Sequence, residues 1–258
     1  MSEISEHTRK YWSYEYDVTA RFMIPLLQRW SVPVAGAAVL DVGCAEGGGL
    51  CAMHDAGGVC AGYDLDEQRI AAAVLLRGDR TIDFRAGDVY KATRPHPGGA
   101  FDLVMLHDVF EHLDHKQAMM AALGEYLKPE GRLLITVPPY YSAYGAHQQH
   151  LQAWFARIPF FHLVPLAMSG ILPRLKNESP VIIEEIQKLS RLKMGMAAFE
   201  DIAASSGMNI MRKRAYLISP NHIRFGLLPV PAGPVAKVPL AGELLCTGVV
   251  YLLGKARA

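Results

Sequence analysis

The sequence predicts an α/β fold: a doubly wound, mostly parallel, seven-stranded Rossmann-like sheet, with a helical N-terminal segment and a lid inserted after the fifth strand. From residue 37 to about 137, short β-rich runs alternate with amphipathic helical stretches, as in a parallel sheet covered on both faces. A helical, aromatic-rich stretch precedes this rhythm, and a hydrophobic, proline-broken stretch interrupts it at about 140–195. We therefore expect a helical segment at 1–36 and one domain at 37–258.

The elements follow from local patterns taken in order. Helical stretches are expected at 66–77 and 114–127, with Asp66 and Asp114 in the N-cap position. After the lid, a helix at 196–207 has Gly207 at its C-terminal end, where glycine is favoured. The seven expected strands lie at 37–42, 59–64, 82–88, 101–107, 132–138, 208–219 and 244–255.

Composition narrows the classes of function. The 258 residues carry a formal net charge of +1, which gives no overall attraction to nucleic acid, and we expect no nucleic-acid partner. The four cysteines form no C-x-x-C pair and have the character of small, reduced core residues. The N-terminus lacks an apolar signal region, and no run of about 20 apolar residues is free of breakers. These features predict a cytoplasmic protein.

A glycine-rich turn follows the first strand, in the stretch VLDVGCAEGGG at 39–49. Glycines at a strand-turn-helix junction let the backbone approach a ligand, and the helix N-terminus favours electronegative groups. The turn does not match the G-x-G-x-x-G dinucleotide pattern, because alanine occupies the second glycine position. The candidate ligand-binding residues here are Asp41, Gly43, Cys44, Ala45 and Gly47.

Polar residues also stand at the ends of the next three strands. Asp64 ends the second strand, where a carboxylate can accept hydrogen bonds from both hydroxyls of an adenosine ribose. Asp88 follows the third strand, in reach of an adenine amine, and His107 and Asp108 follow the fourth at the crevice of a doubly wound sheet. Because these ends meet at one sheet edge, the ordered set is more specific than any single motif.

The stretches VLDVGCAEGGG, GYDLDEQ, RAGDVY and FDLVMLHDVFEHL, in this order and spacing, resemble the class I S-adenosylmethionine-dependent methyltransferases, especially the small-molecule type related to quinone-biosynthesis enzymes. The likeness is good over about 37–138. It implies that Gly43 and its neighbours bind the methionine part of S-adenosylmethionine. It places Asp64 and Leu65 at the ribose, Asp88 and Val89 at the adenine, and His107 and Asp108 at the edge of the fourth strand. The family usually has glycine at the position of Ala45.

Two other classes share parts of this pattern. A nucleotide-dependent oxidoreductase would have the strand-turn-helix and Asp64, but the broken glycine pattern and the residues at the third and fourth strand ends disfavour it. A non-catalytic binding module could keep the fold without the reaction, although the cofactor motifs are intact.

The stretch HDVFEH, with His107, Glu111 and His112, imitates a zinc motif. The H-x-x-E-H arrangement has one residue fewer between its first histidine and the glutamate, so here the first histidine belongs to a strand end. We expect no bound metal, and take Glu111 and His112 as a cap of the following helix and as lining of the cofactor cavity.

The segment TVPPYYSAYGAHQQH, at 136–150, follows the fifth strand. Its proline pair stops the strand and turns the chain into the lid, one strand too late for a motif that grips a planar amine. His147 and His150 are the candidate general bases, with Tyr140 beside them, because histidine can take a proton from an oxygen nucleophile near neutral pH. Packing of the lid is the alternative role for these residues.

The substrate side is expected among aromatic residues of the lid and the N-terminal segment. An apolar lid favours a small or lipid-like acceptor and peripheral contact with a membrane; a hydrophobic core or a homodimer interface is the commoner use of such residues. The N-terminal segment is expected to close over the cofactor site. The candidate substrate residues are Tyr141, Tyr144, Trp154, Tyr11 and Arg21.

Overall fold

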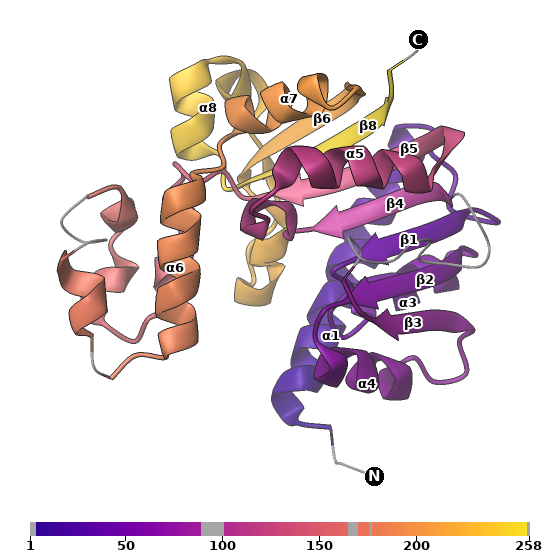
Figure 1. Ribbon diagram of the computed structural model, residues 1–258, viewed down its shortest axis with the longest axis horizontal. Coiled ribbons are helices and arrows are strands. Elements are labelled where there is room, and N and C mark those ends of the chain that lie inside the picture. The colour runs from indigo at the N-terminus through magenta and orange to yellow at the C-terminus, as the bar shows by residue number, and fades with distance from the viewer. Residues whose placement is uncertain (1–3, 89–100, 165–169, 176, 257–258) are drawn as a thin grey trace.

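The computed structural model describes residues 4–88, 101–164, 170–175 and 177–256, and one mixed sheet organises them (Figure 1). The strand order is β3-β2-β1-β4-β5-β8-β6-β7, in which β8 is antiparallel to both of its neighbours. The strands are β1 (Ala38–Val42), β2 (Val59–Asp64), β3 (Ile82–Ala86), β4 (Phe101–His107), β5 (Leu127–Val137), β6 (Met208–Ile218), β7 (Val230–Pro231) and β8 (Gly248–Lys255).

The α/β, doubly wound and mostly parallel architecture is confirmed. The described residues form eight strands, where seven were expected, because the proline-rich loop contributes the two-residue strand β7 at the edge beside β6. The segment expected to be strand from residue 244 begins as helix α8 (Pro239–Leu245), and its strand starts only at Gly248. Proline at the first position favours such a short helix.

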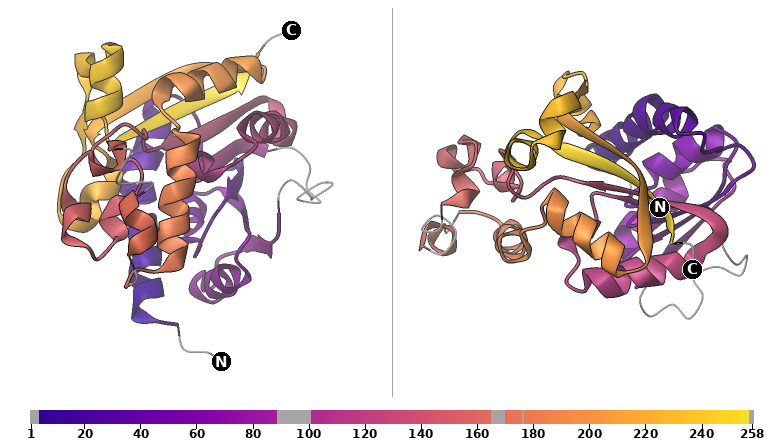
Figure 2. Two further views of the ribbon diagram at one scale, coloured as in Figure 1. Left: turned by 60° about the vertical axis from the view of Figure 1, so that its left-hand side comes forward. Right: turned by 90° about the horizontal axis from the view of Figure 1, so that it is seen from above.

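Two hydrophobic cores lie on opposite faces of the sheet, as the alternation of side chains along each strand requires. Val39 faces the core shared with α1 (Glu6–Val18), α2 (Ile24–Arg29), α3 (Gly48–Asp55) and α4 (Glu67–Leu76), and a π-helical turn (Thr19–Met23) joins α1 to α2. Leu40 faces the core shared with α5 (Lys116–Tyr126) and α7 (Met196–Ser205). The right-hand view of Figure 2 shows these helices on either side of the sheet.

The helix ends test three sequence expectations. The Asp66 carboxylate accepts hydrogen bonds from Gln68 N (2.8 Å) and Arg69 N (3.2 Å), so it caps α4 as expected. Gly207 has φ +71° just beyond α7, also as expected. The expectation for Asp114 is wrong: α5 begins one residue later, with His115 as N-cap and no side-chain cap, and Asp114 instead pairs with Lys188 at 3.0 Å.

The described part of the lid consists of short 3-10 turns and one long helix, α6 (Pro180–Leu192), lying beyond the carboxyl ends of β4 and β5 (Figure 1). It has a small core of its own, whose members are Tyr140, Ala146, Leu151, Ala156, Leu172, Ile186 and Leu189. Helix α6 contacts the 3-10 turn Phe110–His112, which follows β4. Among the described residues, no helix combines the length and apolar character needed to cross a membrane.

Candidate active site

A narrow cavity lies where β1, β4 and β5 end, beneath helix α1. Asp41 and His107, both expected from the sequence, line it together with Thr136 of β5 and Glu15 of α1. Because parallel strands end at one edge, residues 41, 107 and 136 come together although they are far apart in the chain. Gly43 and Cys44 of the glycine-rich turn line the same cavity.

Each of two carboxyl groups in this cavity has one oxygen without a hydrogen-bond partner among the described residues. Asp41 is 6% exposed, and its Oδ1 and Glu15 Oε2 are enclosed with no hydrogen-bond partner among the described residues. Burial raises the pKa of Asp41 to about 7, although nearby His107 opposes the shift. Burial and the neighbouring Glu46 raise the pKa of Glu15 well above its usual value. Unpartnered buried carboxyl groups suit a ligand that brings positive charge.

Asp41 is therefore expected to make stability depend on pH. The folded chain holds the Asp41 proton more tightly than the unfolded chain, so stability falls as pH rises from about 4 to 7 and the full cost applies above 7. Asp41→Asn should remove this slope and become more stable than the wild type by up to about 4 kcal/mol at pH 8, and by less at pH 5. Urea unfolding of both proteins at the two pH values measures the free energies of unfolding. The same change in this free energy between pH 5 and pH 8 in both proteins would contradict the prediction.

The glycine-rich turn is held by the carboxylate of Asp64. Asp64 Oδ2 accepts a hydrogen bond from Ala45 N at 2.9 Å, and its Oδ1 accepts one from Asp66 N at 2.9 Å. The turn uses the left-handed backbone region at Gly43 (φ +81°), Ala45 (φ +48°) and Gly47 (φ +79°). An alanine therefore stands where a glycine would be unstrained.

Replacing this alanine should stabilise the chain. We expect Ala45→Gly to raise the free energy of unfolding by about 0.5–1 kcal/mol, since relief of the left-handed strain exceeds the added flexibility of the unfolded chain. Ala121→Gly makes the same chemical change on an exposed position of α5 and should cost about 1 kcal/mol. Chemical denaturation of the wild type and the two variants shows whether each substitution raises or lowers the free energy of unfolding. A destabilised Ala45→Gly protein would contradict the claim that Ala45 is strained.

The remaining expected cofactor residues lie at the ends of β2 and β3. Asp88 is half-buried and follows β3, while Leu65, after β2, is 74% exposed. Val89 lies outside the described residues. Asp88 and Leu65 thus stand on the neighbouring strand ends that the sequence predicted, and their contacts with a cofactor stay a prediction.

A hydrogen-bond network fixes the end of β4. Thr136 Oγ1 donates to Asp108 Oδ1 (2.6 Å) and accepts from Asp108 N (3.0 Å). Asn221 Nδ2 donates to Asp108 Oδ2, and Asn221 Oδ1 lies 3.1 Å from His107 Nε2. Sequence reasoning missed Thr136, Asn221 and Glu15. Only Thr136 had a signal, its place near the end of a strand beside β4.

A second, wider cavity of about 830 Å³ opens between α1, the end of β4 and the lid. Helix α1 contributes residues to both cavities. The lining combines aromatic, imidazole and charged groups, and includes Tyr11, Tyr14, Arg69, Asp108, His112, His147, His150, Glu185, Asn221 and Arg224. Among the expected catalytic and substrate residues, the structure brings Tyr11, His147 and His150 together here.

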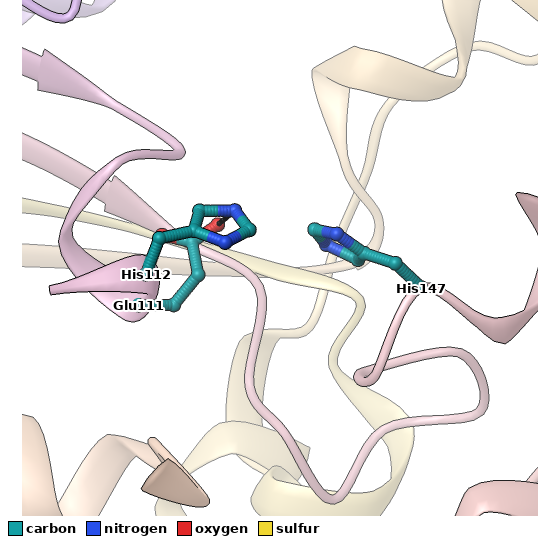
Figure 3. Close-up of side chains that lie close together, drawn as sticks. All are labelled: Glu111, His112 and His147. Atoms are coloured by element: carbon teal, nitrogen blue, oxygen red, sulfur yellow. Dashed lines mark ion pairs between the residues drawn. The ribbon is translucent and has the colours of Figure 1, made fainter. Parts of the chain in front are cut away.

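The imidazole of His147 is oriented by a carboxylate of the lid helix. His147 Nδ1 lies 3.0 Å from Glu185 Oε1, and its ring centre lies 5.4 Å from that of His112 and 5.9 Å from that of His150. The rings of His112 and His147 face each other across a short gap (Figure 3). Burial and His147 lower the pKa of His112 well below its usual range, so its imidazole is neutral near pH 7.

The tyrosines of the segment after β5 do not line this cavity. Tyr140 is 4% exposed in the lid core, where its N–H donates to Met194 O and its carbonyl accepts from His162 Nε2. Tyr141 packs edge-on against Tyr140, and the hydroxyl of Tyr144 donates to Arg157 O at 2.8 Å. Tyr140 and Tyr144 thus hold the irregular lid backbone, the alternative role considered for this segment.

Two further substrate candidates also lie away from the wide cavity. Trp154 is 77% exposed on the lid. Arg21 is exposed on the turn after α1, with its guanidinium 5.6 Å from the ring centre of Phe22. Trp154 and Arg21 therefore lie on the surface of the molecule. Their contact with an acceptor in the wide cavity stays a prediction.

Comparison with known proteins identifies the family. A family described as a methyltransferase domain matches residues 11–166, more than half of the sequence, and the chain belongs to that family. The fold and the site define an S-adenosylmethionine-dependent methyltransferase of class I. The enclosed carboxyl groups of Asp41 and Glu15 fit this cofactor, whose sulfonium and ammonium groups are cationic.

Curated relatives cover part of the chain. A ubiquinone biosynthesis O-methyltransferase of Thiobacillus denitrificans is 31% identical over 139 residues, which is 51% of this chain and 59% of that protein. The protein of the same name in Idiomarina loihiensis is 35% identical over 105 residues, 39% of this chain and 42% of the relative. The matched region thus spans about half the length of these two relatives.

Solved structures share the fold along nearly the whole chain. Magnesium protoporphyrin IX methyltransferase from Synechocystis, with bound S-adenosylhomocysteine, has a TM-score of 0.55 at 15% identity, over 99% of this chain and 90% of that one. An S-adenosylmethionine-dependent methyltransferase from Mesorhizobium loti has a TM-score of 0.57 at 17% identity, over 92% and 99%. At such identities the likeness establishes the fold.

Proposed function

We propose that this chain transfers the methyl group of S-adenosylmethionine to a hydroxyl oxygen of a small or lipid-like acceptor bound in the histidine-lined cavity. One observation carries the proposal: the wide cavity, with its imidazoles, adjoins the narrow cavity across α1 and the end of β4. When bound, S-adenosylmethionine supplies an electrophilic methyl group on a positively charged sulfur. The O-methyltransferase relatives also support oxygen as the acceptor atom.

The chain's own residues supply the other requirements of such a transfer. Asp41 and Glu15 complement positive charge in the narrow cavity, and Asp64, at the end of β2, is the candidate ligand for the ribose. An acceptor hydroxyl reacts more readily once its proton is removed, and His147 and His150 are the candidate bases in the wide cavity. Glu185 fixes the orientation of the His147 ring through the 3.0 Å contact with its Nδ1.

The surface of the lid supports an apolar acceptor. Trp154, Phe160 and Val181 are 77%, 36% and 71% exposed, so the lid presents large apolar side chains to its surroundings. Such side chains favour an acceptor carried by lipid, or peripheral contact of the lid with a membrane.

The proposed function is tested by incubating the protein with S-adenosylmethionine labelled in the methyl group and an organic-solvent extract of cells. We expect a product that is heavier than its precursor by 14 mass units plus the extra mass of the isotope, and that carries the label as an O-methyl group. Label found only on nitrogen or carbon would contradict oxygen transfer. Titration with S-adenosylhomocysteine, run in parallel, establishes that the preparation binds cofactor.

The base is tested separately with His147→Ala and His150→Ala. Loss of turnover in one variant, with unchanged affinity for S-adenosylhomocysteine, would identify the residue that takes the proton. Unchanged turnover and an unchanged pH profile in both variants would leave neither as the base.

A further inference from the structure

We propose that Glu111, His112 and His147 form a binding site for a divalent transition-metal ion, with Zn²⁺ the best match. One ligand atom from each side chain lies within 4.8 Å of the others. The first two residues belong to the 3-10 turn after β4, and the third reaches them from the lid (Figure 3). The ion would therefore join the lid to the sheet.

The carboxylate of Glu111 is the strongest indication of a missing partner. The residue is 2% exposed, and both of its carboxylate oxygens are enclosed without a hydrogen-bond partner in the described part of the chain. The nearest cationic candidate is His112, whose Nε2 lies 3.6 Å from Glu111 Oε1. A buried, ionised carboxylate without partners destabilises the folded chain by roughly several kcal/mol, unless it is protonated or coordinates a cation. A bound cation removes that cost.

His147 is oriented by a second residue, as metal-binding histidines commonly are. The carboxylate of Glu185 lies 3.0 Å from His147 Nδ1, which fixes the ring and leaves Nε2 without a hydrogen-bond partner among the described residues. Metal-binding histidines commonly donate their second N–H to a carboxylate in this way. His147 holds this position with φ +60°, a left-handed conformation that an L-residue adopts at an energetic cost and that is common at functional sites.

The surrounding charges also favour a cation. The carboxylates of Asp108 and Glu185 line the wide cavity together with His112 and His147. The nearby lysines are engaged elsewhere: Lys116 Nζ donates to the backbone carbonyls of Glu111 and Leu113, and Lys188 pairs with Asp114 at 3.0 Å. Neither ammonium group neutralises the Glu111 carboxylate by a hydrogen bond.

The donor types select the ion. Two imidazole nitrogens and one carboxylate oxygen suit Zn²⁺, which takes three such protein ligands in catalytic sites and keeps one position open. Mg²⁺ and Ca²⁺ prefer oxygen ligands throughout. Two ligand atoms about 2.1 Å from one tetrahedral ion lie about 3.4 Å apart, so the ligand atoms, now within 4.8 Å of one another, must approach by up to about 1.4 Å to close the site.

The spacing within HDVFEH, taken alone, predicts no metal here. His107 is the first histidine of that stretch, and it bonds to Asn221 at the end of β4. The third ligand is instead His147 from the lid, which no local spacing could reveal.

The open position faces the wide cavity, which His112 and His147 line. An acceptor oxygen could bind at this open position, and its hydroxyl would then have a lower pKa; this step alone rests on the proposed function. A His147 that ligates the ion cannot also take the proton, so His150 is the remaining candidate base when the ion is bound.

The site is tested by isothermal titration of the tag-free, chelator-treated full chain with Zn²⁺. We expect one ion per chain, and binding at least about tenfold weaker in Glu111→Gln, His112→Gln, His147→Gln and Glu185→Gln. His54→Gln, a histidine at the far end of α3, should bind as the wild type does. No saturable binding at millimolar Zn²⁺, or unchanged affinity in all four variants, would overturn the site.

Two further measurements keep the outcome unambiguous. The visible spectrum of the wild type loaded with Co²⁺ reports nitrogen and oxygen coordination even where a variant fails to fold; a spectrum equal to that of aqueous Co²⁺ would count against the site. Titration with S-adenosylhomocysteine in the presence of chelator separates the two proposals. Retained cofactor binding without any Zn²⁺ binding would reject the metal site and leave the methyltransferase intact.

Discussion

Gly48→Ala is expected to destabilise the chain by about 3 kcal/mol or more, because a Cβ at this position would collide with the backbone carbonyl of Trp12 in the middle of α1. A backbone atom cannot swing aside as the end of a side chain can, so α1 must move away from α3. Since α1 lines both cavities, affinity for S-adenosylhomocysteine should fall as well.

Gly124→Ala provides the matched control. Gly124 lies inside α5, and an added Cβ would meet only Met208 Sδ at 3.7 Å, an ordinary contact. The substitution should leave stability unchanged or raise it by up to about 1 kcal/mol, as glycine is a poor helix former. Thermal unfolding and titration with S-adenosylhomocysteine compare the variants. A Gly48→Ala protein as stable as the wild type would show that α1 does not lie against α3 as described.

Asp64→Asn should weaken S-adenosylhomocysteine binding about tenfold to 100-fold and destabilise the chain by about 2 kcal/mol. Both oxygens of Asp64 accept backbone hydrogen bonds, from Ala45 N and Asp66 N. Asparagine has a single acceptor oxygen, so one of these N–H groups loses its partner and the turn loosens. The charge that would hold the ribose hydroxyls is lost in the same step.

The control for this prediction is Asp83→Asn on the neighbouring strand β3. Asp83 is half-exposed and pairs with Arg85 at 2.9 Å, so its substitution should change stability by less than about 1 kcal/mol and leave the affinity unaltered. Calorimetric titration gives the affinities, and urea unfolding gives the stabilities. Equal affinity in wild type and Asp64→Asn would remove Asp64 from the cofactor site.

The sequence predicted the site residues whose position depends only on one strand and the turn that follows it. Asp41, Ala45 and Asp64 stand at consecutive βα junctions, and parallel strands bring such junctions to one edge without further information. The antiparallel insertion of β8 between β5 and β6 could not be predicted, because the residue pattern of a buried strand does not record its direction.

The parts that the sequence could not predict depend on segments meeting across long separations. Glu15 reaches Asp41 from α1, Asn221 reaches Asp108 from the loop after β6, and Glu185 reaches His147 from α6. The tyrosines after β5 were considered together because they are close in sequence. Tyr140 instead packs in the lid core, where its backbone carbonyl accepts a hydrogen bond from His162, because buried backbone groups of an irregular segment require hydrogen-bond partners.

The position of α1 has a consequence for the order of events in catalysis. Tyr11, Glu15 and Thr19 follow one another at intervals of four residues along α1 and the turn that continues it, with Tyr11 at the wide cavity and the other two at the narrow one. In the proposed function, the methyl donor occupies the inner compartment and the acceptor the outer one. We expect the donor to enter first and the demethylated cofactor to leave last, which is a compulsory-order kinetic scheme.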